Sequence, residues 1–197
     1  DNLHPQYAGD VGIGLNPKLA QRLQDSDLLI VLGPRLGEMT TGGYTMLKPP
    51  RLPQLLVHIH PSAEELNRVY QADLAMLATL GAAASALAAM PVPADVPWAD
   101  WTAQANADYV ANLAPQSLPG DIDMAAVIDV VNRLLPSDAV ITNGAGNFAS
   151  WVHRFHRYHG WAHGHKTQLA PTNGSMGYGV PAGIAANLTT GRTAFTI

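Results

Sequence analysis

Short, continuous runs of apolar residues recur along the first half of the chain. They lie at residues 27–33, 54–60 and 73–78. Runs of this length are typical of strands in a parallel sheet, where both faces of the sheet are covered. Helical segments alternate with them, and we expect these helices at residues 16–24, from residue 61 onward and at residues 81–90. The alternation predicts an α/β fold with a parallel sheet.

Two helix starts in this half carry local signals. Asn16 stands directly before Pro17, which is the order of an N-cap and a first helical residue. Glu64 and Glu65 follow Pro61, and acidic residues in a first turn favour a helix through its macrodipole. We therefore expect the first two helices to begin at these residues.

The second half of the chain follows a proline-rich stretch that begins at Pro91. Its expected elements are a helix at 98–112, a helix capped by Asp121 and ending at Pro136, a strand at 139–142, a helix at 147–158 and a strand at 193–197. We predict two Rossmann-like parallel-sheet units. The predicted bounds are a central domain at 1–90, a linker at 91–118 and a second, incomplete domain at 119–197.

Composition narrows the classes of function. The chain has 197 residues, of which 47% are hydrophobic and 13% charged, so it can bury a core. Its net charge is −4 with only 11 Lys and Arg, which argues against nucleic acid as a partner. No apolar run is long enough for a membrane span, and no signal peptide is visible. The absence of cysteine fits a cytoplasmic protein.

Two glycine-rich segments follow strands of the second half. Residues 143–147 read NGAGN and lie between a strand and a helix, where free amides bind phosphate, although a purely structural turn has the same pattern. Residues 173–187 read NGSMGYGVPAGIAAN and predict a bare loop followed by a closely packed helix of small residues that begins near Pro181. Met176 in this loop is either a ligand contact or a core residue. Ligands bind at the carboxyl ends of parallel strands, so the two segments predict one site.

These segments resemble the thiamine-diphosphate-dependent enzymes of the acetolactate synthase, pyruvate oxidase and benzoylformate decarboxylase group. ITNGAGNFASW and NGSMGYGVPAGIAANL are similar to the first half of their diphosphate-binding domain, within residues 139–197. LLIVLGPRLGEMTTGG and LLVHIHPSAEELNRVYQADLA are similar to their middle domain, within residues 1–90. The resemblance implies decarboxylation or carboligation of a 2-keto acid, with the thiazolium as electron sink.

The resemblance also implies which residues bind the cofactor. Gly146, Asn147 and Phe148 would lie at the diphosphate. Gly174, Ser175 and Met176 would hold the aminopyrimidine, with the Gly174 carbonyl accepting from its amino group and the Met176 side chain under the bend between the rings. Alternatives from other classes are a Rossmann-like module that binds a nucleotide or coenzyme without catalysis, and a purely structural relative.

Parts of the family pattern have no counterpart in these residues. The activating glutamate of the family belongs to an N-terminal domain supplied across a dimer interface, and the Gly-Asp-Gly to Asn motif for Mg²⁺ would begin after residue 197. The resemblance therefore implies a fragment of a homodimeric or homotetrameric enzyme, with metal ligands outside this chain and no catalytic or metal-binding residue of its own. We expect these residues alone to be inactive and to bind thiamine diphosphate weakly.

Histidines bear on two further ligands. Gly33-Pro34-Arg35 resembles the Gly-x-Arg of family members that bind FAD, but His58 and His60 stand where those members have acids, which disfavours FAD. Five histidines crowd the segment at His153, His156, His159, His163 and His165. Their spacing does not match that of helical zinc sites, so we expect histidines that are solvated or line an entrance, rather than a metal site.

Overall fold

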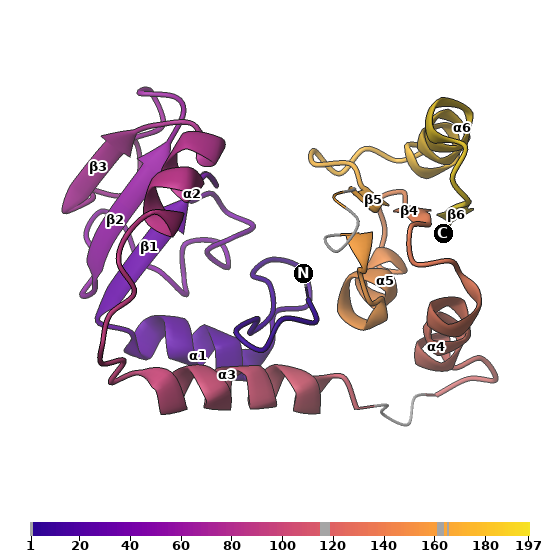
Figure 1. Ribbon diagram of the computed structural model, residues 1–197, viewed down its shortest axis with the longest axis horizontal. Helices are drawn as coiled ribbons and strands as arrows, with labels where there is room; N and C mark the ends of the chain where they lie inside the picture. The colour runs from indigo at the N-terminus through magenta and orange to yellow at the C-terminus, as the bar shows by residue number, and fades with distance from the viewer. Residues whose placement is uncertain (1, 115–118, 161–163, 165) are drawn as a thin grey trace. The chain divides into compact units, whose positions relative to one another are not determined.

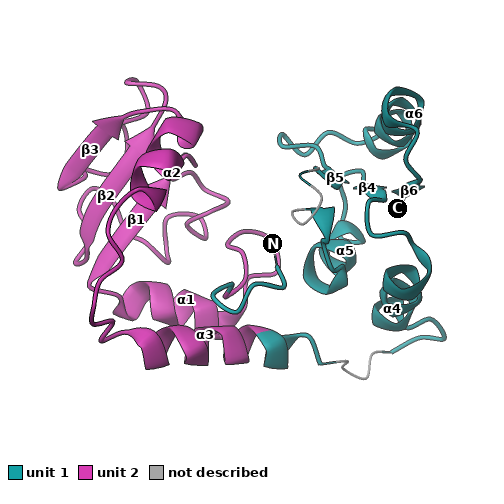
Figure 2. Cartoon of the chain, viewed as in Figure 1, with its two compact units in different colours: residues 1–7, 110–197 teal, residues 8–109 magenta. Residues whose placement is uncertain are grey.

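The computed structural model describes residues 2–114, 119–160, 164 and 166–197. The chain divides into two compact units, which Figure 2 distinguishes by colour. Ala8–Tyr109 form what we call the N-terminal unit, and residues 1–7 with 110–197 form the C-terminal unit. The predicted domain bounds stay a prediction.

A three-stranded parallel sheet forms the centre of the N-terminal unit, in the order β1-β2-β3 (Figure 1). Its strands are β1 (Leu28–Leu32), β2 (Leu55–His60) and β3 (Leu74–Leu77). The helices are α1 (Pro17–Asp25), α2 (Leu80–Ala88) and α3 (Ala99–Asn112), whose last three residues fall in the other unit. Each predicted strand is thus confirmed, as are the predicted helices at 16–24, 81–90 and 98–112.

The main buried cluster of this unit lies on one side of the strands. Its buried residues are Leu29, Leu36, Leu47, Leu56 and Tyr70. The Tyr70 hydroxyl donates to the Leu47 carbonyl at 2.6 Å, which satisfies the polar end of a buried ring. Burial raises the pKa of the Tyr70 hydroxyl.

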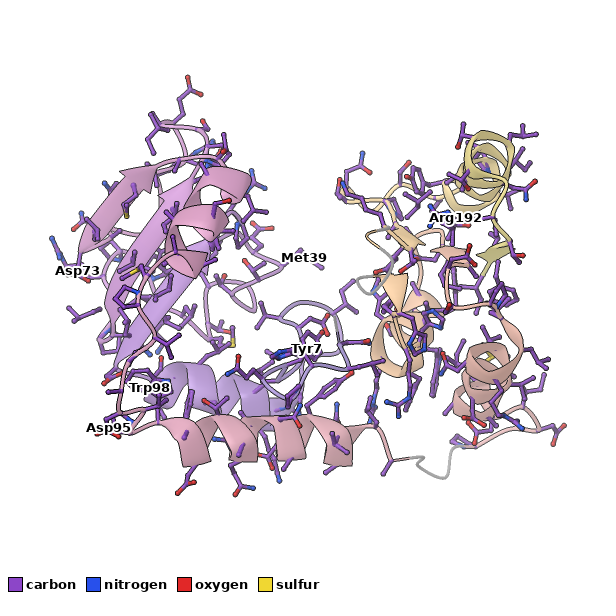
Figure 3. The ribbon with its side chains drawn as sticks, viewed as in Figure 1. Tyr7, Met39, Asp73, Asp95, Trp98 and Arg192 are labelled. Atoms are coloured by element: carbon purple, nitrogen blue, oxygen red, sulfur yellow. The ribbon has the colours of Figure 1, made fainter. Side chains whose placement is uncertain are left out.

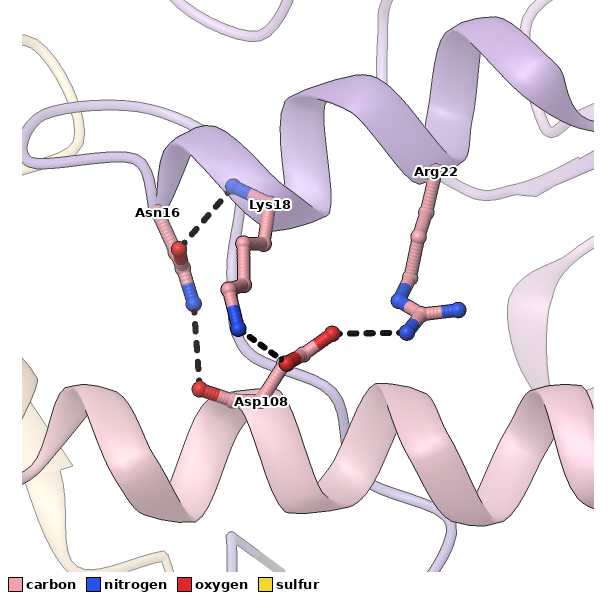
Figure 4. Close-up of polar contacts among 4 residues, drawn as sticks. All are labelled: Asn16, Lys18, Arg22 and Asp108. Carbon is pink, nitrogen blue, oxygen red and sulfur yellow. Dashed lines mark hydrogen bonds and ion pairs between the residues drawn. The ribbon is translucent and has the colours of Figure 1, made fainter.

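Helices α1 and α3 are joined by a cluster of polar contacts around Asp108 (Figure 4). Its carboxylate pairs with Lys18 and Arg22, each at 2.6 Å, and these hydrogen bonds hold the pKa of the Asp108 carboxyl below its usual value. Asn16 caps α1 through the Lys18 N–H at 3.0 Å, as predicted, and its amide also reaches the Asp108 carbonyl. The capping residue of one helix is therefore also a contact to the other.

Trp98 and Trp101 border a hollow of about 780 Å³ in the same unit. Figure 3 labels Trp98, which lies near the start of α3. Three apolar residues that face outward from two strands also line it, namely Leu28, Ile30 and Leu55, together with the polar segment 25–27. These three strand side chains are 43–60% exposed, whereas Ile59 on the same face of β2 is buried.

A second parallel sheet, in the order β5-β4-β6, forms the C-terminal unit. Its strands are β4 (Val140–Thr142), β5 (Gln168–Leu169) and β6 (Ala194–Thr196), and its helices are α4 (Met124–Leu134), α5 (Ala149–Phe155) and α6 (Gly179–Thr190). Ile128, Ile141 and Val152 form its core. Arg192, labelled in Figure 3, donates to the carbonyls of Asp138 and Lys166 and so ties together the segments that lead into β4, β5 and β6. The predicted α/β class with parallel sheets is confirmed.

One predicted helix is wrong. Residues 61–70 form successive turns instead of a helix. Asn67 has a φ of +61°, which is left-handed and interrupts an α-helix, and its side chain accepts from the Ala72 N–H at 2.9 Å. A local side-chain acceptor therefore outweighs the favourable acids at Glu64 and Glu65.

Two helix boundaries also differ from the prediction. Asp123, and not Asp121, caps α4, because its carboxylate accepts from the N–H groups of Ala125 and Ala126. Helix α5 ends at Phe155 instead of Tyr158. Two asparagines hold the backbone past that end. Asn132 accepts from the Arg157 N–H and Asn2 from the Tyr158 N–H, each at 3.0 Å.

Candidate functional site

The two glycine-rich segments lie against each other at the carboxyl end of β4. A Cβ atom on Gly179 would stand 2.8 Å from the Asn143 carbonyl carbon and 2.8 Å from the Gly144 nitrogen. A Cβ on Gly144 would lie 4.0 Å from the Gly177 nitrogen. Only a residue without a side chain fits between the two backbones at Gly179. The predicted neighbourhood of the two segments is therefore present in the structure.

Two threonines anchor α6 on the sheet. The Thr142 hydroxyl is fully buried and donates to the Gly179 carbonyl at 2.8 Å, and it lies 2.7 Å from the Thr196 hydroxyl. A Cβ on Gly183 would stand 2.5 Å from Thr196 Oγ1 and 3.1 Å from Thr142 Oγ1. The helix of small residues predicted after the second segment therefore packs closely, beginning at Gly179, two residues before Pro181.

The first segment presents free main-chain donors. The N–H groups of Ala145, Gly146, Asn147 and Phe148 make no hydrogen bond to another described residue. Gly146, Asn147 and Phe148 are exposed, and α5 begins without a side-chain cap at Phe148. The Phe148 ring covers Gly146 so closely that a Cβ there would overlap it. Successive free N–H groups at a bare turn are the donor set that binds an anion.

The second segment is a turn with its own internal hydrogen bonds. Gly174 has a φ of +70° and donates its N–H to the Pro171 carbonyl at 3.3 Å. The Ser175 N–H donates to the Asn173 side chain at 3.2 Å. Met176 is 83% exposed, so its side chain is not a core residue and that alternative is wrong. The structure brings the second glycine-rich segment close to the first one, at residues 143–147, and leaves the Met176 thioether in solvent.

The histidine cluster divides into residues with different surroundings. His156 is buried against Tyr158, its Nδ1 lacks a hydrogen-bond partner within the described chain, and burial lowers its pKa to about 4. The expectation of a solvated or entrance-lining histidine is therefore wrong for His156. His159 is exposed, and His153 lies 3.3 Å from the Asn143 side chain. His163 and His165 lie outside the described residues.

The strand β2 of the N-terminal unit carries two more histidines. His58 is buried, and its Nε2 lies 3.1 Å from the Pro34 carbonyl. His60 Nδ1 accepts from the Ser62 N–H at 3.0 Å. Arg35 is exposed beside His58 in a small hollow. Both rings are thus engaged with the protein backbone at the positions where the FAD-binding members have acids.

The described residues lack two further kinds of feature. They contain no group of three or more histidine, cysteine or acidic side chains placed to hold a metal ion. They also contain no helix with the length and apolar character needed to cross a membrane.

Comparison with known proteins found similarity to one family and to several curated enzymes. The family described as "Thiamine pyrophosphate enzyme, central domain" matches residues 1–87. Acetolactate synthase of Mycobacterium bovis is 28% identical over 195 residues, covering 94% of this chain and 30% of the relative. The chain is thus similar to thiamine-pyrophosphate enzymes over residues 1–87 and to an acetolactate synthase over nearly its whole length. The resemblance predicted from the glycine-rich motifs is thereby confirmed.

Two other acetolactate synthases overlap with this chain to a similar extent. The acetolactate synthase large subunit of Lactococcus lactis is 28% identical, and that of isozyme 2 of Escherichia coli is 25% identical. Each similarity covers 94% of this chain, and 30% and 32% of the respective relatives. The chain therefore spans about a third of the length of the curated relatives that it matches.

Sequence reasoning missed some residues that shape the site. The sequence pattern places Thr142 in a strand and Gly179 in a loop, but it does not indicate the contact between them. The carboxyl end of a predicted strand next to a glycine in the other segment is the signal that could have indicated it. No sequence signal indicates the contact of His153 with Asn143, because each of the two residues has several other polar residues near it in the sequence that could equally be its partner.

Proposed function

We propose that the two glycine-rich turns form the cofactor-binding part of a thiamine-diphosphate-dependent enzyme that acts on 2-keto acids. The observation that carries the proposal is the close approach of Gly179 to Asn143 and Gly144. It brings the turn that would hold the diphosphate to the turn that would hold the aminopyrimidine. The similarity to acetolactate synthases over 94% of the chain supports the same reading.

The donor chemistry of the first turn fits a diphosphate. Four consecutive N–H groups, from Ala145 to Phe148, have no acceptor among the described residues. The chain carries a net charge of −4, so backbone dipoles, and not a basic patch, would supply the positive potential. Gly146, Asn147 and Phe148 would therefore hold the diphosphate.

The second turn fits a flat aromatic ring that also needs backbone hydrogen-bond partners. Met176 offers an exposed, flexible and polarizable thioether, and Gly174 and Ser175 offer exposed backbone. These three residues would hold the aminopyrimidine. When bound, thiamine diphosphate supplies a thiazolium that accepts the electrons of a decarboxylated 2-keto acid. Magnesium, a dimeric or tetrameric assembly and a cytoplasmic location belong to the same proposal.

A titration that separates the two turns tests this function. Two-dimensional ¹H–¹⁵N spectra of the 197-residue chain would be recorded with pyrophosphate, thiamine and thiamine diphosphate at millimolar concentrations, with magnesium. We expect pyrophosphate to shift the amide signals of 145–148, thiamine those of 174–177, and thiamine diphosphate both sets. Thiamine diphosphate that shifts neither set would refute the proposal.

A matched pair of methionine variants sharpens the test. Met176→Ala removes a side chain that is 83% exposed, so it should leave stability unchanged while weakening thiamine and thiamine diphosphate but not pyrophosphate. Met39→Ala, at a methionine that is 60% exposed in the N-terminal unit, should leave all three unchanged. A module that binds nucleotides would instead respond to ADP at 145–148 and ignore thiamine.

A further inference from the structure

Of the crowded histidines that the structure describes, His153 reaches the first turn. Its Nε2 lies 3.3 Å from Asn143 Oδ1, across ten residues of chain. Asn143 is 2% exposed and directly precedes the turn. Its amide Nδ2 donates to the Gly144 carbonyl at 2.9 Å. A chain of contacts therefore runs from helix α5 through a buried amide to the first peptide of the turn.

The chemistry of these groups fixes which atom donates. A carbonyl only accepts, so the Asn143 NH₂ group must face the Gly144 oxygen and its Oδ1 must face the histidine. The proton of this contact therefore sits on His153 Nε2. In a neutral ring this leaves Nδ1 as an acceptor.

The direction of the next peptide N–H follows from peptide geometry. In a planar trans peptide the C=O and the following N–H point in opposite directions. The Gly144 carbonyl points toward the Asn143 amide, so the Ala145 N–H points away from it. That N–H has no acceptor among the described residues and begins the set of four free donors.

We propose that His153 is a positioning residue that, through Asn143 and the Gly144 carbonyl, aims the Ala145 N–H at the diphosphate. The inference rests on the proposed function, since the anion is the one assigned to this turn. His153 itself does not touch the anion. Its role is to hold the buried Asn143 amide in one of its two orientations.

The experiment compares His153→Ala with His153→Gln in the 197-residue chain. Glutamine keeps an N–H donor on a side chain of similar length, whereas alanine removes it. With inorganic pyrophosphate as the probe, we expect His153→Ala to weaken binding roughly five- to tenfold, the value of about one hydrogen bond, and His153→Gln to stay within about twofold. His159→Ala, at an exposed histidine, is the control and should bind as the unchanged chain does.

A second readout does not depend on a ligand. Long-range ¹H–¹⁵N spectra report which ring nitrogen of His153 carries the proton, and hydrogen exchange reports the Ala145 amide. In the unchanged chain we expect His153 Nε2 to carry the proton. Of the two variants, we expect only His153→Ala to change the Ala145 signal. If the unchanged chain binds no pyrophosphate, the proposed function fails, and these spectra still decide the role of His153. An unprotonated Nε2, or equal Ala145 signals in both variants, would overturn the inference.

Discussion

His156 is a titratable side chain that folding removes from water. Burial lowers its pKa from 6.5 to about 4, with the nearby His159 as a smaller cause. As pH falls through 6.5, His156 takes up a proton in the unfolded chain, whereas in the folded chain it stays neutral until about pH 4. Stability is therefore highest above pH 6.5 and falls progressively between pH 6.5 and 4.

We expect the His156→Leu variant to lose most of this pH dependence. The shift in pKa corresponds to roughly 3 kcal/mol of unfolding free energy between the two ends of the window. Urea unfolding of the unchanged chain and of the variant at pH 7, 5.5 and 4.5 measures it. His159→Ala should keep most of the slope, because burial is the larger cause. If the unfolding free energies of His156→Leu and of the unchanged chain varied equally with pH, His156 would not be the source of the pH dependence.

At the scale of elements, helix α4 allows a direct test of its start. The Asp123 carboxylate accepts from Ala125 and Ala126, whereas Asp121 lies two residues before the cap. We expect Asp123→Ala to lower the unfolding free energy by about 0.5–2 kcal/mol. Asp121→Ala should change it by less than about 0.5 kcal/mol, as exposed positions usually do. Thermal unfolding followed by circular dichroism compares the two, and equal losses would contradict the observed cap.

The elements that the sequence predicts well are those whose signals are local. The strand β2 is an apolar run, and α1 has Asn16 directly before Pro17. The failed helix at residue 61 and the early end of α5 have distant or competing causes. Asn67 turns the backbone left-handed, and Asn2 binds Tyr158 across 156 residues. No window along the chain contains both partners of that last contact.

The short strand β5 illustrates the same limit. Gln168–Leu169 have no alternating or continuous apolar pattern, and the strand exists through its pairing with Ile141 and Thr142. The candidate site was predictable in its residue types and in the pairing of its two glycine turns. The close contacts at Gly179 and Gly183 were not predictable, because they depend on atoms of other elements.

At the scale of the whole molecule, the chain has two compact units with separate cores. We therefore expect a substitution in one unit to loosen that unit alone. Asp108→Asn removes the negative charge that pairs with Lys18 and Arg22 in the N-terminal unit. Gly183→Ala places a methyl group 2.5 Å from Thr196 Oγ1 in the C-terminal unit and should cost about 1–3 kcal/mol.

Hydrogen exchange followed by mass spectrometry separates the two responses. Asp108→Asn should speed exchange in peptides from 8–109, and Gly183→Ala in peptides from 110–197. Gly81→Ala is the control for Gly183→Ala, because a Cβ at Gly81 meets open space. A response that spreads equally over both units would contradict their independence.

The fully buried strand β4 serves both the fold of the C-terminal unit and the proposed binding site. Its last residue, Thr142, holds α6 by one hydroxyl, and the next residue begins the proposed cofactor turn. Damage to the interior of this unit and damage to its recognition of a ligand would therefore look alike in a genetic screen. Conversely, an anion that binds at 145–148 would stabilise the fold and raise its melting temperature. A screen of compounds by melting temperature would therefore detect ligands of the site without an assay of turnover.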